Sequence, residues 1–364
     1  MRSIVHPNVN RAFDHGLQIL KYEGVRQETR NGPALVHPLP LCTTYKHPQQ
    51  RVLFSRVRRA NPFFHLFEAF WMLAGRRDSA FLDQYVSDFG ARYAEPGGNL
   101  HGAYGYRWRH WFTDLMDGEI FDQIEHAIQR LTDDPTDRQV VVAMWDPEVD
   151  FFGGKRDIPC NTHIYFRMIP YHTTRFITQG TNVVSHEVID HVLDMTVCCR
   201  SNDAIWGLFG ANAVHFSVLQ EYVAWRLDCD IGQMHTLSNN FHVYESTLHL
   251  YDPMEPDHDY YSQADGQVTG STTGMESIVA AKSLFSGADA GTFNQELRQW
   301  LVDPTNSSYG MAPVFGELLA PMARAHHAWK NGRDRQSALD LCSAIRHSDW
   351  KLAAETWLKQ RKDR

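Results

Sequence analysis

The stretch Asp157-Ile158-Pro159-Cys160-Asn161 places a thiol directly after a proline, and 40 residues after that thiol the chain reads Arg200-Ser201-Asn202-Asp203. A cysteine is the strongest side-chain nucleophile near neutral pH when a nearby cation stabilises its thiolate. Arginine suits phosphate because its planar guanidinium donates paired hydrogen bonds. The two stretches together predict a nucleophilic thiol, Cys160, beside an anion-binding site that contains Arg200.

Other polar residues along the chain suit the same task. Arg30 and Arg138 each lie in or next to a predicted turn or strand end, where a guanidinium can reach an anion. Asn212, near the start of a predicted helix, can both donate to and accept from the edge of a heterocycle. His242 and Tyr244 lie two apart on a predicted strand, so both point to one face and can reach a sugar hydroxyl. Each signal alone is weak, because a cysteine after a proline and a His-x-Tyr pair are usually structural.

The overall composition is that of a globular protein with an acidic net charge. Of the 364 residues, 43% are hydrophobic and 21% are charged, and the net charge is −8 at pH 7. A general nucleic-acid-binding surface is usually basic, so we expect no nucleic acid among the partners. A local arginine cluster can still bind a small anionic substrate inside an acidic protein.

The six cysteines fit neither a zinc site nor a small disulfide framework, so we expect no structural metal and a reducing, cytoplasmic setting. The N-terminus has no apolar signal core and no stretch is long enough to cross a bilayer, so we expect no membrane. No HExxH pattern occurs among the 20 histidines, and we expect the pair His326-His327 to lie on the surface of a helix.

Hydrophobic periodicity predicts a mixture of helices and strands. The apolar run 62–75 predicts a buried helix that ends at Gly75, and within it Glu68 reads as an edge-of-core carboxylate that reaches solvent. Long helices combined with non-alternating strands indicate an α+β layered fold. The other expected helices are 8–22, 120–132 and 211–227, and the expected strands are 139–145, 161–169, 191–199 and 233–244.

The composition changes after about residue 250. Residues 251–275 are polar and rich in turn-forming residues, which predicts a loop or linker. Helices are then expected over 293–302, 313–330, 335–346 and 349–361. We therefore predict a catalytic domain over residues 1–250, followed over 251–364 by a polar linker and a helical C-terminal extension.

The order of these residues resembles that of thymidylate synthase and its relatives, the pyrimidine-nucleotide hydroxymethylases. The resemblance covers most of residues 28–245 at almost constant spacing, and it implies a mixed β-sheet flanked by helices. Arg30-Asn31-Gly32 resembles the family's mobile phosphate-binding loop, and Cys160 matches its nucleophile. The family's Arg-Ser-x-Asp motif is matched by Arg200, Ser201 and Asp203.

The remaining matches imply the rest of a nucleotide site. Glu68, within HLFEAFWMLAG, matches the family's catalytic glutamate, and Tyr104, within Gly102-Ala103-Tyr104-Gly105, matches its catalytic tyrosine. Arg138 stands where the family has an arginine pair that reaches the phosphate of the other subunit, which implies a homodimer with shared sites. Asn212 matches the base-reading asparagine, and the pair that contacts the ribose 3′-hydroxyl is matched by His242 and Tyr244.

The resemblance also implies the chemistry. The Cys160 thiolate adds to C6 of a pyrimidine nucleoside monophosphate, so that C5 becomes nucleophilic and takes the methylene of 5,10-methylenetetrahydrofolate. Loss of the C5 proton and of tetrahydrofolate leaves an exocyclic methylene, which takes either a hydride to give methyl or water to give hydroxymethyl. Glu68 is expected to organise the water and protons around the base.

Three departures from the methylating pattern favour hydroxymethylation or change the site. Gly90 stands where methylating members have a tryptophan that shields the methylene, so the missing indole predicts room for water. Asn161 replaces the histidine after the nucleophile and is expected to alter catalytic contacts near the exocyclic group at C4. Methylating members end in a short apolar tail that closes over the folate, whereas this chain ends in 359–364 (KQRKDR) after an added helical region, and we do not expect the same closure.

Other departures concern substrate binding. An asparagine at position 212 complements uracil, although segment 206–212 is one residue longer than in the family and lacks its proline. Gln139 after Arg138 leaves one charge fewer for the phosphate, and residues 170–190 form an insertion. We conclude that the chain resembles a folate-dependent hydroxymethylase of dUMP. The alternatives are a dCMP or CMP hydroxymethylase, a methylating thymidylate synthase, and a non-catalytic nucleotide-binding homologue.

Overall fold

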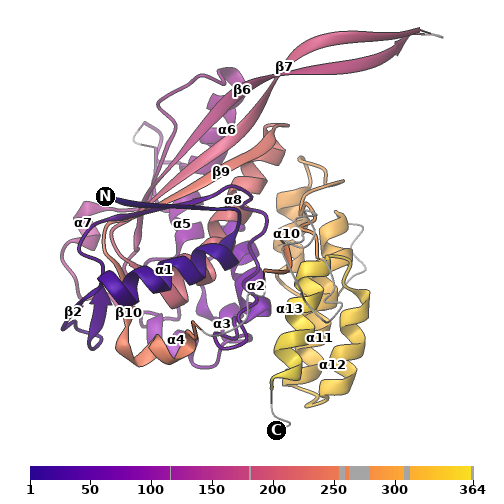
Figure 1. The fold of residues 1–364 in the computed structure, drawn as a ribbon. Coiled ribbons are helices and arrows are strands. Elements are labelled where there is room, and N and C mark those ends of the chain that lie inside the picture. Colours follow the sequence, from indigo (N-terminus) through magenta and orange to yellow (C-terminus); the bar gives the residue numbers. More distant parts are fainter. Residues whose placement is uncertain (115, 180–181, 254–258, 262–278, 307–311, 362–364) are drawn as a thin grey trace.

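The computed structural model describes residues 1–114, 116–179, 182–253, 259–261, 279–306 and 312–361, and for residues 175–179, 182–184 and 186 it describes the backbone alone. The described residues form two β-sheets with helices packed around them, which confirms the predicted α+β class (Figure 1). No helix within these residues is long and apolar enough to cross a membrane.

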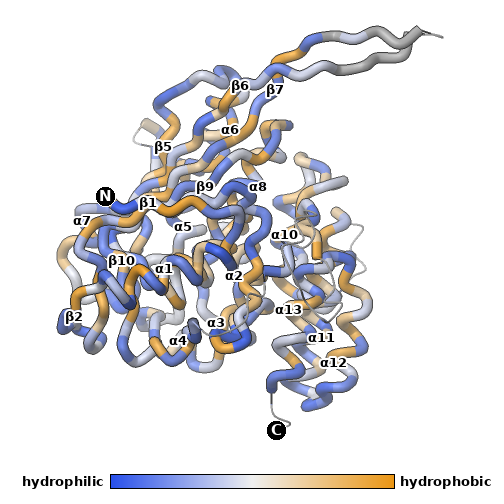
Figure 2. The backbone as a smooth tube through the Cα atoms, in the orientation of Figure 1, coloured by the Kyte–Doolittle hydropathy of each residue, from blue (hydrophilic) through white to orange (hydrophobic). Residues whose placement is uncertain are grey.

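The larger sheet is mixed and has the strand order β1-β4-β9-β7-β6-β5. Pairing is parallel for β1 with β4 and for β9 with β7, and antiparallel for β4 with β9, β7 with β6 and β6 with β5. Hydrophobic and hydrophilic segments both occur along the strands of this sheet (Figure 2). The strands are β1 (Arg2–His6), β4 (Leu41–Tyr45), β5 (Val141–Ala143), β6 (Asn161–Gln179), β7 (Asn182–Cys199) and β9 (Asp230–Ser238).

Strands β6 and β7 form a long antiparallel hairpin whose outer part projects away from the body of the molecule (Figure 1). Its inner end begins at the pair Asn161 and Cys199, and its outer end closes at Gln179 and Asn182. The predicted insertion, residues 170–190, therefore lengthens both strands of one hairpin. The predicted strands 161–169 and 191–199 are its inner halves.

The smaller sheet holds strands from distant parts of the chain in the order β2-β3-β10-β8. Its strand β10 pairs with β8 in parallel, so that His242 lies opposite Asp203. The prediction that residues 233–244 include a strand ending in 241–244 is confirmed by β10, and the chain turns at 239–240 between β9 of the larger sheet and this strand. The strands are β2 (Val25–Gln27), β3 (Ala34–Val36), β8 (Asn202–Asp203) and β10 (Phe241–Tyr244).

Two buried helices lie next to each other in the core and carry the polar residues of the site. In α2 (Pro62–Leu73) Pro62 occupies the first turn and the Asn61 side chain caps it. Helix α8 (Asn212–Arg226) is buried along almost its whole length. Gly105 of α5 (Tyr104–Arg109) allows close contact with α2, because a Cβ there would lie 1.9 Å from the carbonyl oxygen of Met72. The predicted helices over 62–75 and 211–227 are thus confirmed.

The other helices include α1 (Val9–Glu23) and α6 (Gln123–Asp133), which confirm the predictions over 8–22 and 120–132. Helix α4 (Phe89–Tyr93) covers the position of Gly90. The remaining helical segments before residue 251 are α3 (Ser79–Leu82), α7 (Pro147–Asp150), the π-helix η1 (Ala204–Ala211) and the 3₁₀ helix η2 (Glu245–Leu250).

The predicted C-terminal helices are confirmed and lie beside α2 (Figure 1). Trp357 packs edge-on against Phe63 of α2, with ring centroids 5.4 Å apart. His326 is only 3% exposed between Phe63 and Trp357, so its predicted surface position was wrong. Most of the predicted linker 251–275 lies outside the described residues. The C-terminal segments are α10 (Phe293–Trp300), η3 (Phe315–Leu319), α11 (Ala320–Lys330), α12 (Arg335–Leu341), η4 (Cys342–Ala344) and α13 (Ser348–Lys359).

Candidate functional site

Cys160 lies where a loop enters β6, and Arg200 holds this loop in place. The backbone N–H of Arg200 donates to the carbonyl oxygen of Cys160 at 2.9 Å. The Arg200 guanidinium donates to the carbonyl oxygens of Pro159 at 2.9 Å and Ile158 at 3.1 Å. Two residues that are 40 apart in the sequence are therefore neighbours, as the sequence predicted for a thiol and its cation.

Burial raises the pKa of the Cys160 thiol above its ordinary value. The positive charges of Arg200 and Arg30 act in the opposite direction, whereas the carboxylates of Asp157 and Asp203 raise the pKa further. The thiol thus lies among two cations and two anions, and any change in their charges changes its reactivity.

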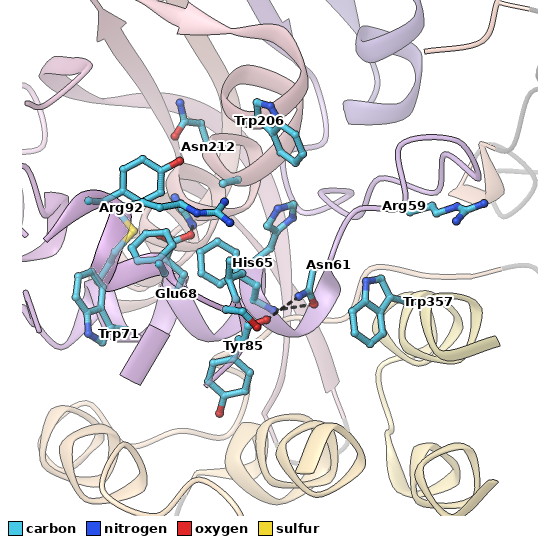
Figure 3. Close-up of a pocket in the computed structure, with 18 of the residues that line it drawn as sticks. Arg59, Asn61, His65, Glu68, Trp71, Tyr85, Arg92, Trp206, Asn212 and Trp357 are labelled. Atoms are coloured by element: carbon cyan, nitrogen blue, oxygen red, sulfur yellow. Dashed lines mark hydrogen bonds and ion pairs between the residues drawn. The ribbon is translucent and has the colours of Figure 1, made fainter. Parts of the chain in front are cut away.

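A cavity of about 780 Å³ lies in front of α2 and α8, and Cys160 itself is not among its lining residues (Figure 3). Its wall contains three of the predicted site residues: Glu68 from α2, Tyr104 from α5 and Asn212 from α8. Asp157, from the loop before Cys160, lines the same cavity. The charge on Cys160 in turn raises the pKa of Tyr104, so the thiol and the cavity are adjacent.

Tyr104 connects the cavity to the start of β6. Burial holds the pKa of its phenol well above the ordinary range, and its oxygen accepts a hydrogen bond from the backbone N–H of Asn161. Its ring stacks on Phe216 of α8 with centroids 5.9 Å apart. A phenol in this position keeps its proton and acts as a hydrogen-bond donor toward the cavity.

The Asn161 side chain does not line the cavity. It is fully buried, and its Nδ2 donates to the carbonyl oxygens of Cys198 at 2.9 Å and His163 at 3.2 Å. The structure therefore places this side chain within the sheet, where it ties the start of β6 to β7. Only its backbone N–H contacts a predicted catalytic group, Tyr104.

Glu68 has a partner that sequence reasoning missed. Its Oε2 lies 2.9 Å from Nε2 of His215, and both side chains are largely buried in the cavity wall. The expectation that Glu68 reaches solvent as an ordinary edge-of-core residue was wrong. His215 follows Asn212 by three residues on α8, so helical periodicity places both on one face and could have indicated this histidine.

Asn212 reaches the cavity although segment 206–212 is predicted to be one residue longer than in the family. The π-helix η1 accommodates the additional residue. A π-helix has i→i+5 hydrogen bonds and takes up one residue more than an α-helical turn. Residues 204–211 form this π-helix, and α8 then starts at Asn212. The additional residue of segment 206–212 therefore does not remove Asn212 from the site.

The amide of Asn212 is held by Asn202, which occupies the variable position of the Arg-Ser-x-Asp motif. Its Nδ2 donates to Oδ1 of Asn202 at 3.1 Å, and Nδ2 of Asn202 donates to Oγ of Ser238 at 3.1 Å. Gly207 packs over this pair, since a Cβ there would lie 2.6 Å from Asn202 Oδ1. The buried chain of hydrogen bonds holds the plane of the Asn212 amide, with its Nδ2 toward Asn202.

Asp203 and the neighbouring Arg58 lie next to η1. One carboxylate oxygen of Asp203 caps the helix by accepting the N–H groups of Ile205 at 2.8 Å and Trp206 at 2.6 Å. The other oxygen is buried and has no hydrogen-bond partner among the described residues, and burial raises the pKa of this group. Arg58, which the sequence analysis missed, donates to the carbonyl oxygen of Ile205 at 3.0 Å, and burial lowers its pKa to about 10.

The smaller sheet places the predicted sugar-contacting and phosphate-contacting residues near each other. His242 and Tyr244 share one face of β10, with ring centroids 5.1 Å apart. The Tyr244 hydroxyl accepts a hydrogen bond from Asn31 at 3.2 Å, which ties it to the loop that carries Arg30. Ser201 is half-buried and directly follows Arg200.

Arg138 lies apart from this cluster. It is exposed in the turn before β5, at the edge of the larger sheet. The structure of one chain therefore does not bring Arg138 to the cavity formed by that chain.

The prediction that Gly90 opens space in the cavity was wrong. A Cβ at Gly90 would lie 2.4 Å from Oγ of Ser79 and 2.8 Å from Oδ2 of Asp83, so this position faces away from the cavity. The neighbouring aromatic side chains of α4, Phe89 and Tyr93, line the cavity instead. Sequence spacing located the segment but not the direction of its side chains.

The C-terminal helices form the other side of the cavity. Trp357 lies across the cavity from Trp71 and Arg92 (Figure 3). The added helical region thus contributes a wall to the site, which the comparison of C-terminal tails did not anticipate. Its cavity-lining residues are His326, Trp329, Lys330, Trp357 and Arg361. Among the described residues, no group of acidic, histidine or cysteine side chains could hold a metal ion.

Comparison with known proteins agrees with this geometry. Residues 13–260 match the family model described as thymidylate synthase. The chain belongs to the thymidylate synthase family. It is 36% identical to a deoxyuridylate hydroxymethyltransferase of Pseudomonas phage M6, over all of this chain and 95% of that protein. It is 31% identical to the protein of the same name from Bacillus phage SP01, over 56% of this chain and 49% of that protein. A thymidylate synthase of Buchnera aphidicola is 27% identical over 50% of this chain.

The site combines features that thymidylate synthase chemistry needs. A thiol beside arginines can add to an electron-poor ring carbon, and a buried glutamate and tyrosine can move protons near that ring. A fixed amide can read a base edge. The cavity extends from Tyr104 and Asp157 to the C-terminal helices, and its volume of about 780 Å³ is in the range of small-molecule sites.

Proposed function

We propose that this protein is a folate-dependent one-carbon transferase that converts dUMP to 5-hydroxymethyl-dUMP. The observation that carries the proposal is the 36% identity to a deoxyuridylate hydroxymethyltransferase, which extends over the full chain including the helices that line the cavity. A similarity confined to the sheet would support only a nucleotide site. The match over the C-terminal wall favours the same reaction.

Cys160 is the proposed nucleophile toward C6 of the pyrimidine. Because burial raises the pKa of its thiol, the thiolate depends on the nearby positive charges of Arg200 and Arg30. When a nucleotide binds, its electron-poor ring lies next to the sulfur of Cys160, and its phosphate accepts hydrogen bonds from these arginines. Arg30, Arg200 and Ser201 are the phosphate-binding residues of this chain, and His242 and Tyr244 are those that contact the sugar.

Asn212 is the proposed base-reading residue, and its orientation favours uracil. Uracil offers an N3–H donor beside the O4 acceptor, whereas cytosine offers the reverse pattern. An asparagine amide can read either base by rotating about its terminal bond. In the arrangement of this structure Nδ2 of Asn212 donates to Asn202 Oδ1, and Oδ1 of Asn212 is left to accept from N3–H, which is the pattern for uracil.

Glu68, Tyr104 and Asp203 are the proposed proton-handling residues around the ring. Glu68 is paired with His215 at 2.9 Å, so a proton can be shared between them as the ring gains and loses charge. Tyr104 carries a proton at neutral pH because burial raises its pKa. Asp203 retains one buried oxygen that is free to accept a hydrogen bond from a bound molecule.

The cavity fits 5,10-methylenetetrahydrofolate, which supplies the one-carbon unit. Its flat ring needs apolar walls, and its glutamate tail needs cations. The wall offers Trp71, Phe89 and Trp329 as stacking surfaces. Arg92 projects into the cavity from α4 (Figure 3). The residues that would hold this cofactor therefore come from α2 and α4 on one side and from the C-terminal helices on the other.

We also propose that two copies of the chain form a homodimer through the larger sheet. Six directly paired residues, one from each strand, point to one face of this sheet, and three of them are largely exposed: Val5 54%, Val141 44% and Tyr165 42%. A sheet face with exposed hydrophobic residues is typical of an interface. The row consists of Val5, Thr44, His235, Thr196, Tyr165 and Val141.

The homodimer explains the position of Arg138, which precedes β5 at the edge of the same sheet. If each site takes Arg138 from the partner, co-expressed Cys160→Ala and Arg138→Ala subunits form hybrids in which one site is intact. We expect the mixture to regain about a quarter of wild-type turnover. Turnover no greater than that of the two single variants would contradict shared sites. Six free cysteines further favour a reducing, cytoplasmic setting.

Product analysis tests the proposed reaction. Incubation with dUMP and 5,10-methylenetetrahydrofolate should give a nucleotide heavier than dUMP by one CH₂O unit, without the absorbance of dihydrofolate. Mass spectrometry of the nucleotide and absorbance of the folate measure both. The Cys160→Ala variant serves as the blank. A product heavier by one CH₂ unit, with dihydrofolate formed, would assign the protein as a methylating synthase instead.

Substitution of Asn202 tests the proposed choice of base. In the Asn202→Leu variant the Asn212 amide loses its fixed partner, so the preference for dUMP over dCMP should fall roughly fivefold, as expected for one lost hydrogen bond of about 1 kcal/mol. Calorimetric titration with each nucleotide measures the ratio. Ser238→Ala, one step further from the base, should have a smaller effect. An equal loss of affinity for both nucleotides would show that Asn202 supports the fold without selecting the base.

A further inference from the structure

One carboxylate of the cavity has no role in the steps above. Asp157 is three residues before Cys160, is half-buried, and lines the cavity together with Glu68 and Tyr104. Its Oδ2 accepts the backbone N–H of Gly102 at 3.1 Å. A Cβ at Gly102 would lie 3.0 Å from the same oxygen, so the absence of a side chain there allows this close approach. The position of the carboxylate is therefore built into the loop.

Asp157 is an acid without a charged partner. None of the ion pairs among the described residues includes it, and the nearby basic groups His101 and Arg107 are both bound to Asp150. Burial raises the pKa of Asp157 to about 6, and the negative charge of Glu68 acts in the same direction. A carboxylate with a raised pKa is suited to accept a proton near neutral pH.

Asp157 is also near the carbon that reacts with water. Its charge raises the pKa of both the Cys160 thiol and the Tyr104 phenol, so it lies close to both groups. Cys160 marks the position of C6, and the exocyclic carbon is attached to the adjacent C5. Of the other carboxylates nearby, Glu68 is paired with His215 and serves the protons of the ring, and Asp203 does not line the cavity.

We propose that Asp157 is the general base that deprotonates the water which adds to the exocyclic methylene. This inference rests on the proposed function. The water oxygen forms a bond to the exocyclic carbon while its proton passes to Asp157, and the electron pair of the exocyclic double bond moves into the ring as an enolate. The enolate then re-forms the C5–C6 double bond and expels the Cys160 thiolate. The addition consumes one water and needs no oxidant or reductant.

The Asp157→Asn variant separates this step from the earlier ones. With enzyme in excess over dUMP that carries tritium at C5, tritium release should stay within about threefold of wild type, because it precedes the addition of water. Formation of the hydroxymethyl nucleotide should fall by about 100-fold. In the Asp157→Asn variant, added 2-mercaptoethanol should attack the exocyclic methylene and give a thioether of the nucleotide, because this thiol does not need Asp157 to become nucleophilic.

The matched control is Glu95→Gln, which neutralises a partly exposed carboxylate that accepts the N–H of Arg156 outside the cavity. Its tritium release and product formation should both equal those of the wild type. The melting temperature and dUMP affinity of Asp157→Asn check that the variant is folded. Parallel loss of tritium release and product in a folded Asp157→Asn variant, or an unchanged product yield, would overturn the role. A wild-type protein that makes no hydroxymethyl nucleotide would refute the proposed function instead.

Discussion

The antiparallel pairing of β6 with β7 is the constraint on which the site depends. It brings Arg200 to Cys160 through a backbone hydrogen bond of 2.9 Å, although the two residues are 40 apart in the sequence. The pairing of β6 with β7 continues without a register shift from His163 and Cys198 to the outer end at Gln179 and Asn182. Residues added at the outer end therefore lengthen both strands equally and do not disturb the inner end. The chain can therefore carry a long projecting hairpin and still keep the thiol, its cation and the following Asp203 in place.

A second adjustment of the same kind places the base-reading residue. The additional residue before Asn212 is taken up by a π-helix, and the amide is then oriented by Asn202 and Ser238. The helix is kinked within this segment at Gly210, whose backbone angles are not helical, and π-helical segments of this kind are frequent at functional sites. The third adjustment is the C-terminal helical region, whose Trp357 packs on Phe63 of α2 and so joins the cavity wall to the core. Each change in sequence length is absorbed locally, and the cavity remains continuous.

Sequence reasoning predicted the elements whose patterns are local. The apolar helices α2 and α8 and the inner halves of β6 and β7 follow from periodicity, and the ordered motifs identified Cys160, Glu68, Tyr104 and Asn212. What it could not predict depends on direction and tertiary contact. Sequence spacing assigned Gly90 to the cavity, yet a side chain at this position would point toward Ser79. The aromatic residues beside it line the cavity instead. The pairing of His215 with Glu68 and the place of Asp157 in the cavity wall depend on α2, α8 and the loop before Cys160 lying together.

In the proposed reaction, a water molecule held in this cavity adds to the exocyclic carbon in the last step. The reaction of the wild-type protein with dUMP and 5,10-methylenetetrahydrofolate in water enriched in oxygen-18, followed by mass spectrometry of the product, tests this step. We expect a hydroxymethyl nucleotide whose new hydroxyl carries the heavy oxygen in proportion to its enrichment in the solvent. A product that contains no solvent oxygen, or that carries a methyl group, would contradict it.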